Sequence, residues 1–221
     1  MDSLFKQMLL EYEINNSRDR ENAIKQIIQE FVLCGLSRSG FFEHAAFCGG
    51  TALRIFYKLD RFSEDLDFSL TSVDKNFKLE KYFPMLIREL NSLGVKMEVQ
   101  EKIKTGDSHV QSAFVKGNTR QLYLLFYTDP NIINSLHRDS LIRVKFEIDI
   151  CPPPYANYEY KTRQYPYLYQ VRIHDLPSLF AGKLNALIAR KWRNRIKGRD
   201  FYDFIFYINK NVKFNLKHLE A

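Results

Sequence analysis

Apolar residues recur along the chain with two different periods, and each period predicts a kind of element. Ile24, Ile27, Ile28, Phe31 and Val32 are spaced three or four residues apart, which places them on one face of a helix. We expect this helix to stop at Gly35, because glycine commonly follows the last helical turn. In 66–70, apolar and polar residues alternate instead, which predicts a half-buried strand.

The same reasoning predicts the remaining elements. A short apolar run at 45–48 precedes Gly49 and Gly50, after which Thr51 can cap a helix. Further strands are expected at 95–99, 110–115, 121–127 and 141–150, and further helices at 83–93, 176–188 and 201–208. Strands dominate the first part and helices the last. The chain is therefore expected to be an α+β protein, with a core over 1–155 and a helical C-terminal part over 156–221 packed on it.

Composition narrows the class of protein. The 221 residues are 45% hydrophobic and carry a net charge of +7, with a pI near 9.2. Such a chain can bury a core, and its charge favours polyanionic partners such as nucleic acids or nucleoside triphosphates. The three cysteines show no metal-site or disulfide spacing, and there is no signal peptide or long apolar span. We therefore expect a cytoplasmic protein with no membrane partner.

Two acidic residues in the strand at 66–70 and just before it suggest a metal site. Side chains two residues apart on a strand point to the same face, so Asp65 and Asp67 should project together. Adjacent carboxylates repel each other unless a cation lies between them, and paired oxygen ligands suit Mg²⁺ or Mn²⁺. An Asp-x-Asp pair by itself also occurs on solvated strand edges. The pair indicates a metal site only in combination with the motifs that lie near it in the sequence.

A Gly-Gly-Thr motif at 49–51 ends fourteen residues before Asp65. Gly49 and Gly50 allow a phosphate to approach the backbone closely, and the helix that follows offers free N–H groups at its start. An ordinary glycine turn is the simpler interpretation when the pair is considered alone. A strand, Gly-Gly-Thr, a helix and then Asp-x-Asp together predict a triphosphate site beside a metal site. A third carboxylate would allow two metals to bind, and either Glu147 or Asp149 can supply it.

Three blocks resemble the AbiEii/AbiGii toxin family of nucleotidyltransferases, within the DNA polymerase β-type superfamily. These blocks are GGTALRIFYKLDRFSEDLDFSL, VKFEIDICPPP and LFAGKLNALIARKWRNRIKGRDFYDFIFYI. The resemblance implies a mixed sheet flanked by helices, with a helical C-terminal part. It also implies a toxin, neutralised by a cognate antitoxin protein, that transfers nucleotides from a nucleoside triphosphate to RNA, with transfer RNA as the acceptor in some members.

The resemblance also assigns roles to individual residues. Gly49, Gly50 and Thr51 would form the nucleotide loop, and Ser63 would contact the triphosphate or orient that loop. Asp65, Asp67 and Glu147 would hold the metals, with Glu147 preferred over Asp149. Lys183 would neutralise the triphosphate. Asp200 would be the first acid of the final block, with Asp203 as its helical neighbour.

The C-terminal segment adds two observations of its own. A lysine is rarely buried alone, so Lys183, on an otherwise apolar helix surface, should meet a phosphate or an acid such as Asp200, unless its side chain reaches solvent. Asp200, Asp203 and Tyr207 form one polar face beside an apolar stripe at 201–208. A dense basic block either contacts RNA or is a solvated face; its members are Arg190, Lys191, Arg193, Arg195, Lys197 and Arg199.

Two other functions fit the same residues. A nucleotidyltransferase-like fold can bind RNA or a protein without catalysis, although all the expected acids are present here. Within the enzymes, the acceptor can be a small molecule or a protein side chain, and only the basic segment favours RNA. The five histidines show no ligand spacing, and the sequence assigns no role to them.

Overall fold

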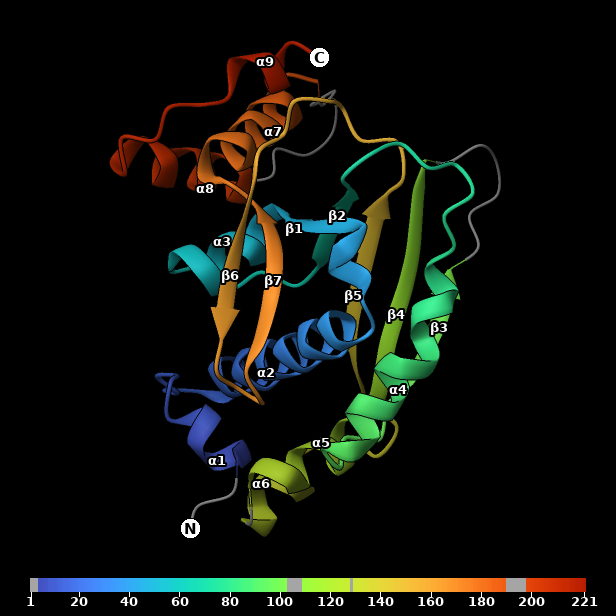
Figure 1. Ribbon diagram of the computed structural model, residues 1–221. Helices are drawn as coiled ribbons and strands as arrows, with labels where there is room; N and C mark the ends of the chain where they lie inside the picture. Colours follow the sequence, from blue (N-terminus) through green and yellow to red (C-terminus); the bar gives the residue numbers. More distant parts are fainter. Residues whose placement is uncertain (1–3, 103–108, 128, 190–197) are drawn as a thin grey trace.

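A seven-stranded mixed sheet forms the centre of the computed structural model, which describes residues 4–102, 109–127, 129–189 and 198–221 (Figure 1). Its strand order is β3-β4-β5-β2-β1-β7-β6. The strands are β1 (Ala45–Cys48), β2 (Leu66–Leu70), β3 (Glu98–Lys102), β4 (Val110–Asn118), β5 (Leu141–Asp149), β6 (Tyr158–Arg163) and β7 (Tyr169–His174). β2 runs parallel to β5, and β1 parallel to β7, while the other neighbours are antiparallel. The expected mixed sheet flanked by helices is confirmed.

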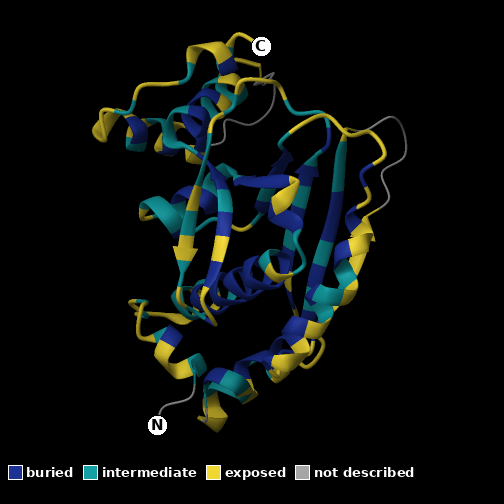
Figure 2. Cartoon of the chain, viewed as in Figure 1, coloured by how far each residue is buried: buried dark blue, intermediate teal, exposed yellow. Residues whose placement is uncertain are grey.

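Helix α2 (Ser17–Arg38) supplies the largest part of the core packed on this sheet. The Asn16 side chain accepts a hydrogen bond from the Asp19 N–H and so caps its start. Its apolar stripe, predicted from the sequence, is fully buried, and Figure 2 shows the helix as a buried rod against the central strands. The helix does not stop at Gly35 but continues to Arg38, and the chain turns at Gly40, whose φ is 77°.

Gly35 has a packing role rather than a terminating one. A Cβ atom at this position would lie 2.7 Å from the Leu86 side chain of α4 (Phe83–Ser92). Glycine therefore allows α4 to approach α2 closely, so the expected stop at this residue was wrong. The other described helices on this side of the molecule are α1 (Leu4–Leu9), η1 (Phe41–Glu43), η2 (Leu79–Tyr82), α5 (Thr119–Phe126) and α6 (Pro130–Asn134).

The segment 121–127, expected to be a strand, is instead part of helix α5. The Asn118 side chain accepts a hydrogen bond from the Gln121 N–H, which starts a helix directly after β4. Leu122, Tyr123 and Phe126 are then buried on one side. The strand expected at 95–99 begins later, at Glu98. The strand predictions at 110–115 and 141–150 are confirmed by β4 and β5.

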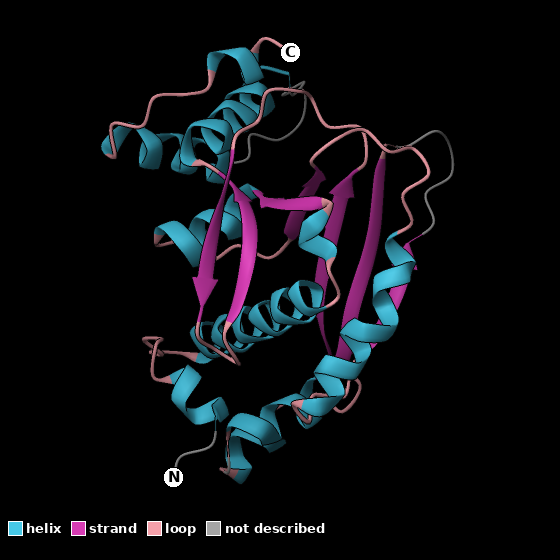
Figure 3. Ribbon diagram, in the orientation of Figure 1, coloured by secondary structure: helices cyan, strands magenta, loops and turns pink. Residues whose placement is uncertain are grey.

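The C-terminal part begins with a hairpin rather than with helices. Residues 158–174 form β6 and β7, which extend the same sheet beside β1, so the expectation of a helical part that begins at residue 156 is wrong for this segment. Tyr169, Val171 and Ile173 alternate with more exposed residues and are buried. Helices α7 (Leu176–Ala189), α8 (Gly198–Asn209) and α9 (Leu216–Leu219) follow and gather at one end of the molecule (Figure 3).

This helical end is where β2 and β5 point. Both strands run toward α7, α8 and α9 in Figure 1, and α3 (Gly49–Tyr57) contacts β1, β2 and α7. Side chains at the ends of β1, β2 and β5 therefore meet side chains from α7 and α8. None of the helices in the described ranges has the length and hydrophobicity that crossing a membrane requires.

Candidate active site

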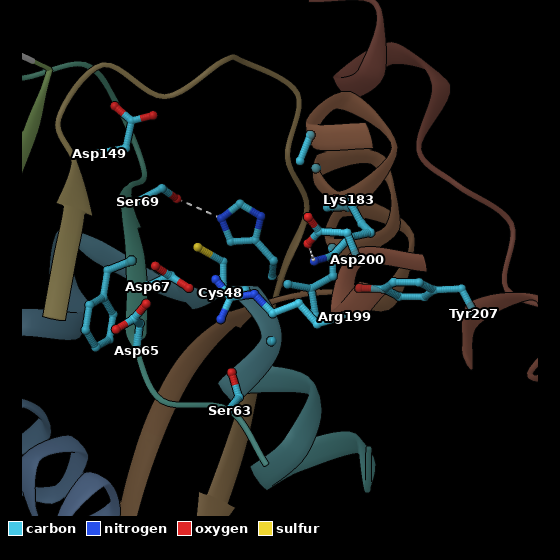
Figure 4. A pocket seen from close by; sticks show the side chains of 18 of the residues that line it. Cys48, Ser63, Asp65, Asp67, Ser69, Asp149, Lys183, Arg199, Asp200 and Tyr207 are labelled. Atoms are coloured by element: carbon cyan, nitrogen blue, oxygen red, sulfur yellow. Dashed lines mark hydrogen bonds and ion pairs between the residues drawn. The ribbon is translucent and has the colours of Figure 1, made fainter. Parts of the chain in front are cut away.

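A pocket of about 360 Å³ lies between the sheet and the C-terminal helices. Residues of β1, α3, β2, β5, α7 and α8 line it, together with the loop before β2 (Figure 4). The predicted site residues among them are Gly49, Gly50, Ser63, Asp65, Asp67, Asp149, Lys183, Arg199 and Asp200. The fold therefore brings three separate blocks of the sequence to one concave site.

Asp65 and Asp67 lie at the start of β2 on the sheet side of this pocket. Asp67 is level with Cys48 of β1 on one side and with Glu147 of β5 on the other. Burial, and then the charges of Asp65 and Glu147, raise the pKa of Asp67 to about 6. Burial also raises the pKa of Asp65, against the opposite effect of Lys145. Both carboxylates would therefore gain from a cation in the pocket.

Gly49 is required at the turn from β1 into α3. Its φ is 75°, and a Cβ atom on this residue would lie 2.4 Å from the Asp67 Oδ2 atom. A Cβ on Gly50 would lie 2.9 Å from the Ser63 hydroxyl, so Ser63 lies directly against this turn. Within the described residues, no side chain caps the first N–H groups of α3, which start beside the acid pair. Such a helix start can bind an anion.

Thr51 does not cap α3, because the helix begins two residues earlier, at Gly49. Thr51 is fully buried, and its hydroxyl donates a hydrogen bond to the backbone carbonyl of Asp65. The side chain therefore links the first turn of α3 to the start of the acidic strand. Its role in the structure is to position Asp65.

The two candidate third carboxylates on β5 have different surroundings. The Glu147 Oε2 atom lies 2.5 Å from the Lys145 Nζ atom, and Oε1 accepts a hydrogen bond of 2.8 Å from Ser112. The Asp149 Oδ1 atom accepts a hydrogen bond of 2.9 Å from the Cys151 N–H, and its carboxylate points away from the acid pair in Figure 4. No group of three or more metal-binding side chains is arranged to hold an ion among the residues that the structure describes.

The helical side of the pocket contains a network of ion pairs. The Lys183 Nζ atom lies 3.0 Å from Asp200 Oδ1 and 2.8 Å from Asp203 Oδ2. Arg61, in the loop before β2, donates two hydrogen bonds of 2.7 Å to Asp203. The expectation that Lys183 meets an acid such as Asp200 is confirmed.

This network explains why α8 buries its polar face. Asp200, Asp203 and Tyr207 are 2%, 0% and 1% exposed, whereas Ile205 and Ile208 on the apolar side are about half exposed. Charged side chains are almost never fully buried unless they are paired, and Lys183 and Arg61 provide the partners. The sequence predicts the helix and its two faces, but the apolar stripe does not show which face is buried.

Of the basic block, only Arg199 lies within the described residues. It lines the pocket, and its charge opposes the rise in the pKa of Asp65 that burial causes. The other members lie outside the described residues; they are Arg190, Lys191, Arg193, Arg195 and Lys197. Contact between this block and RNA stays a prediction.

The structure also adds pocket residues to which the sequence assigned no role. His174, at the end of β7, lies 2.7 Å from the Ser69 hydroxyl, the contact drawn as a dashed line from Ser69 in Figure 4. Burial lowers the pKa of His174 to about 4, so its imidazole is neutral at pH 7. Ser69 could have been found because it follows Asp65 and Asp67 at the same spacing of two. No sequence signal marked His174, whereas Lys145 lies in the VKFEIDICPPP block that carries the family resemblance.

Comparison with known proteins gives a family and a fold. Residues 32–221 match the family model described as nucleotidyl transferase AbiEii toxin of a type IV toxin–antitoxin system. The crystal structure of JHP933 from Helicobacter pylori is similar over 86% of this chain, with 20% identity and a TM-score of 0.52. A second Helicobacter pylori structure, of a protein assigned as a nucleotidyltransferase, matches 89% of this chain with 18% identity and a TM-score of 0.48.

The two matched structures belong to longer chains. The alignments span 66% of the JHP933 chain and 70% of the second chain. At these identities the first match supports the fold alone. No curated protein matches the sequence significantly.

Proposed function

The chain belongs to the AbiEii family of nucleotidyl transferase toxins, and from this premise we propose that it transfers a nucleotide from a nucleoside triphosphate to an RNA acceptor. One observation carries the proposal. The carboxylates of Asp65 and Asp67 share a pocket with the start of α3, and the turn at Gly49 brings the backbone against Asp67. A site for a cation therefore adjoins a site for an anion.

The acid pair fits a divalent metal ion. Burial and mutual repulsion oppose ionisation of Asp67, and a bound cation relieves both. Mg²⁺ in nucleotide enzymes is held by one or two carboxylates together with substrate phosphates, so two aspartates suffice, and Mn²⁺ suits the same ligands. When bound, the ion would supply positive charge to the phosphates and lower the pKa of an attacking hydroxyl. Glu147 and Asp149 are the candidates for a third ligand.

The chain's own groups would bind and orient the triphosphate. The N–H groups at Gly49 and Gly50 and the start of α3 offer hydrogen bonds and a favourable dipole to phosphate oxygens. Ser63 lies against this turn and would orient it or donate to a phosphate. Lys183, held by Asp200 and Asp203, would place its charge toward the pyrophosphate that leaves.

RNA is proposed as the acceptor, with transfer RNA as one form of it, because a member of the basic block lines the pocket. That residue is Arg199, and the other members of the block precede it directly in the sequence. The net charge of +7 favours a polyanion. The family model further supports a toxin with a cognate antitoxin partner, and we propose that both act in the cytoplasm.

The experiment incubates the purified protein with each α-³²P-labelled nucleoside triphosphate, total RNA and either Mg²⁺ or EDTA. The proposal predicts label in RNA, in one size class if the acceptor is transfer RNA, and none with EDTA. Label in protein or in a small molecule would instead support the rival acceptors. A chain that binds RNA or a partner protein but turns over no triphosphate would be a non-catalytic module, and the proposed function would be wrong.

A further inference from the structure

Strand β5 and the start of β2 place four charged groups side by side next to the pocket, and two of them, Asp65 and Asp67, line it. Glu147 of β5 is level with Asp67 of β2, and Lys145 precedes Phe146, which is level with Leu66. Lys145 therefore lies beside Asp65, and adjacent strands are only about 4.8 Å apart. The ammonium group of Lys145 interacts electrostatically with both aspartates as well as with Glu147.

We propose that Lys145 is a built-in cation of the acidic site, which holds Glu147 by an ion pair and leaves Asp65 and Asp67 to bind one divalent ion without Glu147. This inference rests on the proposed function and deepens it. Lys145 and Glu147 are positioning residues in this account. They set the charge around the metal ligands without belonging to them.

The contacts of Glu147 support this role. One of its oxygens is paired with Lys145 at 2.5 Å and the other accepts from Ser112 at 2.8 Å. Ser112 is itself fully buried on β4, level with Glu147. A metal bound by Glu147 would have to share a carboxylate oxygen with one of these two contacts, and its positive charge would lie next to the ammonium group of Lys145. Glu147 is also absent from the residues that line the pocket, whereas Asp65 and Asp67 are among them.

The charge balance points the same way. Taken by themselves, the four described groups Asp65, Asp67, Glu147 and Lys145 carry two net negative charges, which a single divalent ion neutralises. A second ion held by protein groups alone would add two uncompensated positive charges next to Lys145. Lys145 would therefore take the place of a second metal and compete with the first for Asp65.

The chain contains a matched control. Lys161 and Glu159 have the same spacing on β6, at the far edge of the sheet, and their charged atoms are 3.2 Å apart. This pair has a similar partial exposure to solvent, but two strands separate β6 from β2 and its acid pair. Replacing Lys161 removes an equivalent strand ion pair without touching the acid pair.

The test titrates Mn²⁺ into the purified full chain and follows the free ion by electron paramagnetic resonance. The variants are Glu147→Gln, Lys145→Met, Lys161→Met and Asp67→Asn, each checked for folding by circular dichroism. The wild type is expected to bind one Mn²⁺ per chain, and Lys161→Met to match it. Glu147→Gln should weaken binding less than tenfold, and Lys145→Met should tighten it at least threefold while slowing transfer.

Three results would overturn the inference: a tenfold or greater loss of Mn²⁺ affinity in Glu147→Gln, a second protein-held ion in the wild type, or Lys145→Met binding Mn²⁺ no more tightly than the wild type. A purely structural role for Lys145 would not tighten metal binding. Failure of the proposed function has a different signature. In that case the wild type and Asp67→Asn would bind Mn²⁺ equally poorly, and no variant would differ from them.

Discussion

The two sides of the pocket both carry aspartates, but they differ in charge balance. Among the described residues of the helical side, Asp200 and Asp203 form ion pairs with Lys183 and Arg61 at 2.6 to 3.0 Å. On the sheet side, Glu147 is paired with Lys145, and the charges of Lys145, Arg199 and Lys183 only partly offset the effect of burial on Asp65 and Asp67 (Figure 4 labels Asp65, Asp67 and Asp200).

The difference separates two tasks within one site. A balanced network holds its members in place, because breaking any pair leaves a buried charge alone. In an unbalanced cluster, burial and repulsion between the carboxylates oppose their ionisation, as the raised pKa of Asp67 reflects. A bound cation would offset both effects. We therefore propose that the sheet side binds the metal and that the helical side positions the nucleotide.

Removing Lys183 tests the balanced side and has the largest expected effect on stability. Lys183→Met leaves Asp200 without this partner and Asp203 with Arg61, and should lower the free energy of unfolding by about 3–5 kcal/mol. Urea denaturation measures it. The control is Lys116→Met, whose pair with the exposed Glu98 at 3.7 Å should be worth less than about 1 kcal/mol. If both variants lost the same free energy of unfolding, the ion pairs on the helical side would not be holding that side in place.

Two glycines with the same backbone conformation test the contact between the turn and the acid pair. Gly49 and Gly94 both have a φ of 75°, but a Cβ meets Asp67 only at Gly49, and meets nothing within 4 Å at Gly94. Each alanine variant should lose about 1–2 kcal/mol of stability through its backbone. Gly49→Ala should also slow transfer about a hundredfold by displacing Asp67. Similar activity in the two variants would contradict this role for the turn.

The pH dependence of stability in the metal-free protein compares two buried groups of the pocket. Folding raises the pKa of Asp67 from 3.8 to about 6, so between these values the folded state holds the extra proton and stability falls as pH rises. Folding lowers the pKa of His174 from 6.5 to about 4, so here the unfolded state holds the extra proton and stability rises with pH. The two contributions oppose each other between about pH 4 and 6.

Variants separate these two contributions. Asp67→Asn should make the free energy of unfolding rise more steeply with pH, by up to about 1.4 kcal/mol per pH unit. His174→Gln should shift the slope in the opposite direction and can keep a hydrogen bond to Ser69. Urea denaturation at several pH values without metal measures both slopes. An unchanged slope in Asp67→Asn would mean that the sheet side carries no uncompensated charge.

The smallest expected effect concerns Thr51, whose hydroxyl bonds the Asp65 carbonyl. Thr51→Val should cost about 1 kcal/mol of stability and slow transfer about tenfold, because it loosens the strand that carries the acid pair. Thr71→Val removes a comparable but exposed hydrogen bond to His44 and is the control. Transfer rates under saturating triphosphate should distinguish them. If both variants kept wild-type activity, Thr51 would serve stability alone.

Local patterns predicted much of this molecule. Alternation identified β2, β4 and β5, and helical spacing identified α2, α7 and α8. The pocket brings together Asp65, the glycine turn and Lys183, as the motif order predicted. These features depend on short-range spacing, which the sequence records directly.

The rest depends on packing between distant segments. Leu122, Tyr123 and Phe126 suit a strand by composition, and only the cap at Asn118 and the core under α5 make them helical. Likewise, the stripe on α8 could not reveal that Asp203 is the buried side, because its partners Lys183 and Arg61 come from other elements. The pairing of Lys145 with Glu147 required the strand register.

The most direct test of the central claim compares nucleotide transfer by the wild type and by the Asp65→Asn/Asp67→Asn variant, with Mg²⁺ and the labelled triphosphate that the wild type uses. The double variant should fold at least as stably as the wild type, because it removes buried charges that oppose folding. We predict that its transfer falls at least about a thousandfold, which corresponds to about 4 kcal/mol of transition-state stabilisation. Incorporation at the wild-type rate by the folded double variant would contradict the account.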